Sequence, residues 1–95
     1  MEIDDFEWSP EKARANLAKH GVTFLEAASV FEDPGSIVVF DEDHSDSEER
    51  FIIIGYSVKE RLLLVAHADG REGKIRLISA RKATRKEREV YEGIE

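Results

Sequence analysis

The segment RFIIIGYSVKERLLLVAHADGREGKIRLISA, residues 50–80, decides the fold class. It contains three mainly apolar runs, each long enough for one β-strand: residues 50–58, 61–68 and 74–80. Short turns at Lys59-Glu60 and at residues 69–73 join these runs, and turns of that length connect antiparallel neighbours. We therefore expect an antiparallel meander of three strands.

The first two of these strands are apolar on both faces. Ile52 and Ile54 point to one side of the predicted sheet, whereas Phe51 and Ile53 point to the other. A half-solvated sheet would alternate with polar residues, so both faces require cover. We expect the second face to be covered by the last helix or by a partner.

The flanking segments predict the remaining elements. Before the meander we expect a strand over residues 3–8, a helix from Ser9-Pro10 to Gly21, a helix that begins at the Thr23-x-x-Glu26 capping box and ends near residue 31, and a strand over residues 36–40. A second capping box, Thr84-x-x-Glu87, begins a terminal helix. The predicted class is α+β in the order β-α-α-β-β-β-β-α, with one antiparallel sheet and helices packed on it. No linker or repeat interrupts the chain, so we expect one domain over residues 1–95.

Composition excludes several kinds of site. The 95 residues include no cysteine, which excludes a disulfide framework, a thiolate zinc site and a cysteine nucleophile, and suits a reducing compartment. No apolar run reaches 18 residues, and the first five residues are acidic rather than basic. These observations predict a cytoplasmic protein with no membrane partner.

The net charge of −7 is unevenly distributed. Residues 1–49 carry 14 acidic and 3 basic side chains, whereas residues 50–95 carry 11 basic and 7 acidic ones. Residues 71–88 alone hold eight Lys and Arg against two Glu. Such a segment can attract phosphate, or the two halves can neutralise each other across the folded domain.

Several motifs along the chain resemble one known family. The matching segments are FEWSPEK (residues 6–12), Asn16 to Ala27 with the sequence KHGV inside it, Val30 to Pro34, ERFxxIG (residues 49–55) and IRLISARKAT (residues 75–84). Together these segments resemble the BrnT family of bacterial toxins from about residue 6 to residue 92. Toxins of this kind are commonly basic overall, whereas this chain is acidic.

The resemblance implies a RelE-like fold and a ribonuclease toxin of a type II toxin–antitoxin system. Its activity would be metal-independent endoribonuclease cleavage, without a cofactor, that inhibits translation and growth. The implied partners are RNA as substrate and a BrnA-like antitoxin that neutralises the toxin, with operator DNA bound only through the antitoxin.

Metal-independent RNA cleavage requires a base for the ribose 2′-hydroxyl, cations for the phosphorane charge and an acid for the leaving 5′-oxygen. Arg81 and Arg76 are the candidate phosphate-binding catalytic residues, because guanidinium donors match phosphate oxygens. Alternatively, Arg76 sits in its strand with a carboxylate partner. His67, at a predicted strand end, is the candidate for proton transfer, or it only hydrogen-bonds a neighbouring turn.

The candidate RNA-binding residues lie around the last helix and at strand starts. They are Lys82, Arg85, Lys86, Arg50, Arg61 and Tyr91. Pairing with neighbouring glutamates explains Arg50 and Arg61 better than RNA contact does, and a core or interface role explains Tyr91 better than base stacking does. Lys19 and His20 precede a helix-ending glycine, where the helix dipole alone favours cations.

The acidic loop of residues 41–49 does not fit an EF-hand, because Asp46 and Ile52 stand where Gly and Glu are required. We therefore predict no metal site. An alternative to the toxin is a non-catalytic module in which the basic segment binds an acidic partner or nucleic acid, with harmless overexpression as its signature.

Overall fold

Local sequence signals set the boundaries of the first and last helices. The computed structural model describes residues 2–94. Helix α1 (Pro10–His20) begins where the Ser9 hydroxyl accepts the Lys12 N–H, and it ends at Gly21, whose φ of 69° is left-handed. Helix α3 (Arg85–Glu92) begins with a reciprocal capping box between Thr84 and Glu87. Both predicted helix starts are confirmed.

Helix α2 (Phe24–Ser29) continues into the 3-10 helix η2 (Val30–Glu32). The Thr23 hydroxyl accepts the Glu26 N–H, as a capping box requires. The Glu26 carboxylate does not return to Thr23, however. It is buried, accepts the Ser57 hydroxyl at 2.7 Å and pairs with the Arg61 guanidinium. A cationic partner for a buried carboxylate therefore replaces the predicted second half of the capping box.

The sheet has five strands, in the spatial order β1-β5-β4-β3-β2. Their bounds are β1 Phe6–Glu7, β2 Ile37–Phe40, β3 Arg50–Tyr56, β4 Leu62–Asp69 and β5 Ile75–Lys82. Three further 3-10 helices lie outside the sheet: η1 Ile3–Asp5, η3 Glu42–His44 and η4 Arg71–Gly73.

The sheet is mixed, so the prediction of one antiparallel sheet is wrong at its edge. Strands β2 to β5 pair antiparallel, which confirms the meander, but β1 pairs parallel to β5 through Phe6 and Ile75. The strand expected over residues 3–8 shortens to two residues. The side chain of Asp5 accepts the Glu2 N–H at 2.7 Å and holds the preceding residues in a 3-10 turn.

A β-bulge interrupts the pairing of β4 with β5. His67 pairs with Leu77 and Ala66 pairs with Ser79, so Ile78 is an extra residue on β5. Because residues paired across neighbouring strands point to the same face of the sheet, this register shows which face each side chain of β5 occupies. Leu77 and Ala80 both lie in the main core, although they are three residues apart.

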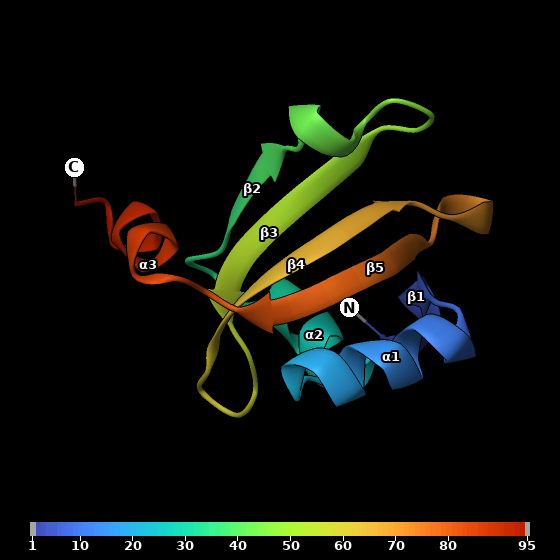
Figure 1. Ribbon diagram of the computed structural model, residues 1–95, viewed down its shortest axis with the longest axis horizontal. Helices are drawn as coiled ribbons and strands as arrows, with labels where there is room; N and C mark the ends of the chain where they lie inside the picture. The colour runs from blue at the N-terminus through green and yellow to red at the C-terminus, as the bar shows by residue number, and fades with distance from the viewer. Residues whose placement is uncertain (1, 95) are drawn as a thin grey trace.

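The two faces of the sheet differ in cover. Helices α1 and α2 lie on one face and enclose the main core, whereas α3 lies at one end of the molecule, away from them (Figure 1). The opposite face, called here the open face, holds a smaller cluster of Ile54, Leu62 and Leu64 with Tyr56 and Tyr91 packed against it. The last helix thus covers only part of the second face.

Asn16 fixes α1 to the edge of β5. Its amide nitrogen donates to the carbonyls of Val22 (3.0 Å) and Ala80 (2.8 Å), and its amide oxygen accepts the Ala80 N–H at 3.0 Å. The amide thereby replaces a neighbouring strand for Ala80. No helix within residues 2–94 has the length and apolarity that crossing a bilayer requires.

Candidate functional site

Three arginines share the open face of the sheet. Arg50 and Arg76 are both partners of Ala68 in the strand register, and Arg81 is the partner of Leu64. The unbroken register of β3 with β4 places Ala68 and Leu64 on the same face. The predicted catalytic pair, Arg76 and Arg81, is therefore on one face, and the predicted RNA-binding residue Arg50 joins it.

Each of these arginines has a carboxylate close by. Arg76 donates to Glu48 at 2.5 Å, and the same glutamate oxygen lies 3.7 Å from Arg50 Nε. Arg81 makes a bidentate pair with Glu87 of α3, at 2.8 and 2.9 Å. The sequence allowed two roles for Arg76, phosphate binding or pairing with a carboxylate, and the structure contains the pairing.

The pKa shifts reflect these pairs. The hydrogen bond from Arg76 lowers the pKa of the Glu48 carboxyl, and the hydrogen bond from Arg81 lowers that of Glu87. Glu87 in turn raises the pKa of Arg81. Both carboxylates therefore stay ionised near neutral pH, and a phosphate that binds either guanidinium competes with a resident anion.

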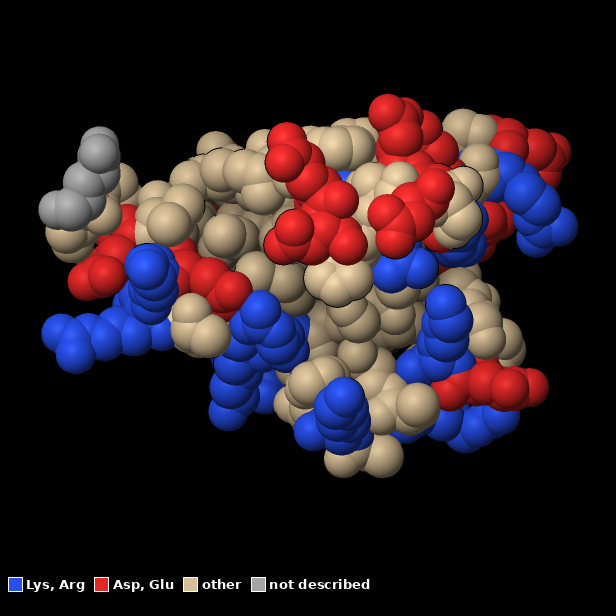
Figure 2. Space-filling model, turned by 45° about the horizontal axis from the view of Figure 1, so that its top comes forward, with Lys and Arg blue, Asp and Glu red and all other residues tan. Residues whose placement is uncertain are grey.

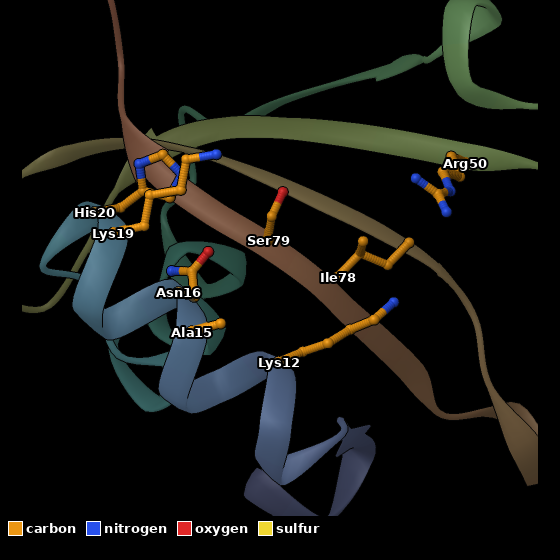
Figure 3. A pocket seen from close by; sticks show the side chains of 8 residues that line it. All are labelled: Lys12, Ala15, Asn16, Lys19, His20, Arg50, Ile78 and Ser79. Carbon is orange, nitrogen blue, oxygen red and sulfur yellow. The ribbon is translucent and has the colours of Figure 1, made fainter.

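A hollow of about 300 Å³ lies between α1 and β5 and is called here the α1–β5 hollow. Figure 3 shows its side chains: Lys12 extends from α1 toward the side where Arg50 lies, while Lys19 and His20 stand at the opposite end. Ser79 lies between them on β5. The lining consists of Lys12, Ala15, Asn16, Lys19, His20, Arg50, Ile78 and Ser79 and includes no carboxylate. The lining side chains therefore contribute only positive charge, although Glu48, which is not among them, lies 3.7 Å from Arg50 Nε.

A second hollow of about 330 Å³ lies on the open face and is called here the sheet hollow. It shares Arg50 and Ser79 with the first hollow and adds Arg81. Its remaining lining is Asp41, Asp43, His44, Ile52, Leu64 and Ala66. The two hollows together bring the side chains of β3, β5 and α1 around Ser79.

His67 lies away from both hollows. It is on the helix-covered face, about 8% exposed, with its ring 5.0 Å from that of Phe31 and 6.0 Å from that of Phe51. Burial lowers the pKa of its imidazole, which keeps the ring neutral. The expectation that His67 is reachable is wrong, because β4 continues to Asp69 and the residue sits inside the strand.

Arg61 and Tyr91 serve packing and internal pairing in this structure. Arg61 binds Glu26 and also donates to the Gly21 carbonyl at 3.2 Å. The Tyr91 hydroxyl donates to Asp33 at 2.8 Å, and its ring packs edge-on against Tyr56. For Tyr91 the structure contains the packing role that the sequence left open. Arg61 does form an ion pair, but with Glu26, which is distant in sequence, and not with the neighbouring glutamate that was expected.

The cations of the last helix are dispersed. Arg85 and Lys86 are exposed and line neither hollow, whereas Lys82 lies at the end of β5. Figure 2 shows Asp and Glu side chains gathered along the upper part of one side of the molecule, with Lys and Arg standing along its lower margin. Among the described residues, no group of three His, Asp or Glu side chains is arranged to hold a metal ion.

The comparison with protein families decides the identity of the chain. The model described as "Ribonuclease toxin, BrnT, of type II toxin-antitoxin system" matches residues 8–87, most of the sequence. The chain belongs to the BrnT family. No curated protein sequence matches it significantly.

A solved structure shares the BrnT fold with this chain. It is the crystal structure of the Brucella abortus ribonuclease toxin BrnT, at 21% sequence identity and a TM-score of 0.64. The match covers 84% of this chain and 96% of the Brucella chain. At this identity the likeness concerns the fold, an α+β domain with a five-stranded sheet.

Lys12, Ser79 and Lys19 of this BrnT-family chain line the α1–β5 hollow, although the sequence pattern did not mark them as candidate site residues. A signal was present. Lys12 and Lys19 are seven residues apart on one helix, on the same side as the buried Asn16. This spacing places both lysines at the edge where the helix packs on the sheet, where they line the hollow together.

Proposed function

We propose that this BrnT-family protein is a metal-independent endoribonuclease whose scissile phosphate binds in the α1–β5 hollow. The observation that carries the proposal is the convergence of Lys12, Lys19, His20 and Arg50 on a hollow with no carboxylate in its lining. Phosphate is the anion that such a set of donors fits, since ammonium, imidazolium and guanidinium groups all donate to its oxygens.

The proposed reaction is transfer within the RNA. The ribose 2′-oxygen loses its proton to a base and attacks the adjacent phosphorus, while the bond from phosphorus to the 5′-oxygen breaks and that oxygen takes up a proton. The products are a 2′,3′-cyclic phosphate and a 5′-hydroxyl. The charge that develops on the phosphoryl oxygens is stabilised by Lys12 and Arg50, which contribute most if they are already in position.

We assign the proton transfers to His20 rather than to the buried His67. Imidazole is the side chain that most readily gains and loses a proton near neutral pH. His20 lines the hollow at the end opposite Arg50 and is partly exposed, so a substrate can reach it. Arg76 and Arg81 keep a role in phosphate binding on the open face, where RNA would displace Glu48 and Glu87.

The wider role follows the family. We propose that RNA cleavage inhibits translation and growth in the cytoplasm, and that a BrnA-type antitoxin neutralises the protein and alone carries operator DNA binding. A RelE-like classification of the fold and a single domain over residues 1–95 belong to the same proposal. The match to a ribonuclease toxin family of type II systems supports it.

The test is cleavage of total RNA by the purified protein in EDTA. We expect cleavage by the wild type and a loss of about 10²–10⁴-fold for His20→Ala with an unchanged melting temperature. The matched comparison is His67→Gln, which is expected to lower stability while its folded fraction still cleaves. Intact RNA at micromolar wild-type protein refutes the activity, and full cleavage by His20→Ala refutes the assignment.

A second candidate function is a binding module without catalysis. The pairing of Arg76 with Glu48 and of Arg81 with Glu87 favours it, because both cations are already neutralised. Under this hypothesis the protein forms a salt-sensitive complex with RNA, leaves the strand intact and does not arrest growth when expressed alone.

A further inference from the structure

A third hollow lies at the end of the sheet beyond the two already described. It has a volume of about 240 Å³ and is called here the hairpin hollow, because the turn between β3 and β4 forms one side. Its lining is Glu60, Arg61, Leu62, Lys82, Ala83 and Arg88. Three cations and one carboxylate thus surround an apolar floor.

Two of these cations carry uncompensated charge. Within residues 2–94, Lys82 makes no ion pair, and Arg88 donates to the neutral Tyr56 hydroxyl at 3.1 Å. Arg61 is different, because the buried Glu26 neutralises it. The affinity of the hairpin hollow for an anion therefore rests on Lys82 and Arg88.

The hairpin hollow continues the line of the α1–β5 hollow. Ser79 of the first and Lys82 of the second are three residues apart on β5, about 10 Å at roughly 3.3 Å per residue. Their side chains point to opposite faces, since Ser79 pairs with Ala66 and Lys82 with Leu63, so a strand that reaches both hollows crosses the edge of β5 between them. Lys19 and His20 lie beside the C-terminal half of β5 (Figure 3). Strand β1 pairs with β5 only at Ile75 and Arg76, so this part of the strand edge has no neighbouring strand.

We propose that the hairpin hollow is a second phosphate-binding site, which takes a phosphodiester further along the RNA strand whose scissile phosphate occupies the α1–β5 hollow. This inference rests on the proposed function and names its substrate as single-stranded RNA long enough to reach both hollows. Within residues 2–94, no aromatic side chain lines the hairpin hollow, so the second site holds the backbone and does not read bases.

Lys82→Ala/Arg88→Ala tests the site against two lengths of RNA. The binding probes are 2′-O-methyl oligonucleotides, which lack the nucleophile and remain intact: a dinucleotide that fills only the first hollow and an octanucleotide that reaches both. A control variant, Arg14→Ala/Lys74→Ala, removes the same charge from exposed or half-buried positions that line none of the three hollows.

We expect a loss confined to the longer RNA. Each phosphate contact on a single strand contributes about 0.7 to the slope of log affinity against log salt, which is about fivefold in affinity at 0.1 M salt. Loss of two contacts therefore weakens octanucleotide binding by about 25-fold and lowers the slope by about 1.4, while dinucleotide binding changes less than twofold.

The outcomes separate this inference from the proposed function. Equal losses for both lengths, or a loss for the octanucleotide no larger than that of the control variant, overturn the second site while RNA binding itself stands. If the wild type binds neither probe and cleaves no RNA, the proposed function fails and the inference fails with it. Lys82→Glu, which leaves the Arg88 hydrogen bond intact, gives the same readout if the double variant unfolds.

Discussion

Substitution of Glu48 by Gln is expected to strengthen RNA binding. Glu48 holds Arg76 at 2.5 Å and lies 3.7 Å from Arg50, and the three side chains are 31–36% exposed. Ion pairs as exposed as these add little to stability, so Glu48→Gln should unfold at nearly the same urea concentration as the wild type. One released guanidinium that gains a phosphate contact raises affinity about fivefold at 0.1 M salt, and two raise it about 25-fold.

The assay is titration of a labelled, non-cleavable RNA oligonucleotide at several salt concentrations. Glu49→Gln is the matched control, because it removes the same charge from the exposed neighbouring residue. Since Arg76 lowers the pKa of Glu48, wild-type affinity should rise as the pH falls through that lowered pKa. Glu48→Gln should show a smaller rise, because only Glu87, whose pKa Arg81 lowers, is then left to release an arginine. Equal affinities for the two variants would show that release of the arginines contributes nothing.

Three further predictions concern stability. Arg61→Ala leaves the buried Glu26 carboxylate without its cation and should cost about 2–3 kcal/mol in urea denaturation, the lower part of the range for buried pairs because Arg61 is partly exposed. Since Arg61 lowers the pKa of Glu26, this stabilisation should be present at neutral pH and disappear as the pH falls through the lowered pKa; a loss independent of pH contradicts it. Tyr91→Phe should cost about 1–2 kcal/mol, and the bond to Asp33, which raises the pKa of Tyr91 to about 12, should stabilise below pH ~10 and fade as the pH passes through 12. Absorbance titration should show a tyrosine that ionises near pH 12 in the wild type, and this ionisation should be absent from Tyr91→Phe. Asn16→Ala should cost about 2–3 kcal/mol by the same denaturation assay, because it leaves backbone groups of β5 unsatisfied, and a loss below about 1 kcal/mol would mean that water replaces the amide.

Features that depend on neighbouring residues were predictable from the sequence. Ser9, Gly21 and Thr84 act within one helical turn, so the ends that they set are where the sequence places them. The meander was predictable because its connections are short. The parallel pairing of Phe6 with Ile75 was not, because a two-residue strand has no period of its own and its partner is distant in sequence.

The candidate site was predictable in residue type but not in position. Arg50 and Arg81 do line a shared hollow. Their resident carboxylates come from a loop and from a separate helix, and no local pattern links Glu48 to Arg76. His67 was misplaced because the length of β4, which decides whether the imidazole is at an end or inside, depends on pairing with both neighbours.

The extra residue in β5 determines which face of the sheet carries the charged side chains of that strand. Arg76 and Arg81 are five positions apart, and in an unbroken strand an odd spacing would send them to opposite sides. Ile78 shifts the alternation by one, so both emerge together and Ala80 turns inward. If Ile78 instead paired with Ala66, as in a regular strand, every later side chain of β5 would change face, and the guanidinium of Arg81 would take the place of the buried methyl group of Ala80. The unpaired position of this one residue thus keeps the guanidinium groups of Arg76 and Arg81 on the solvent side of the sheet.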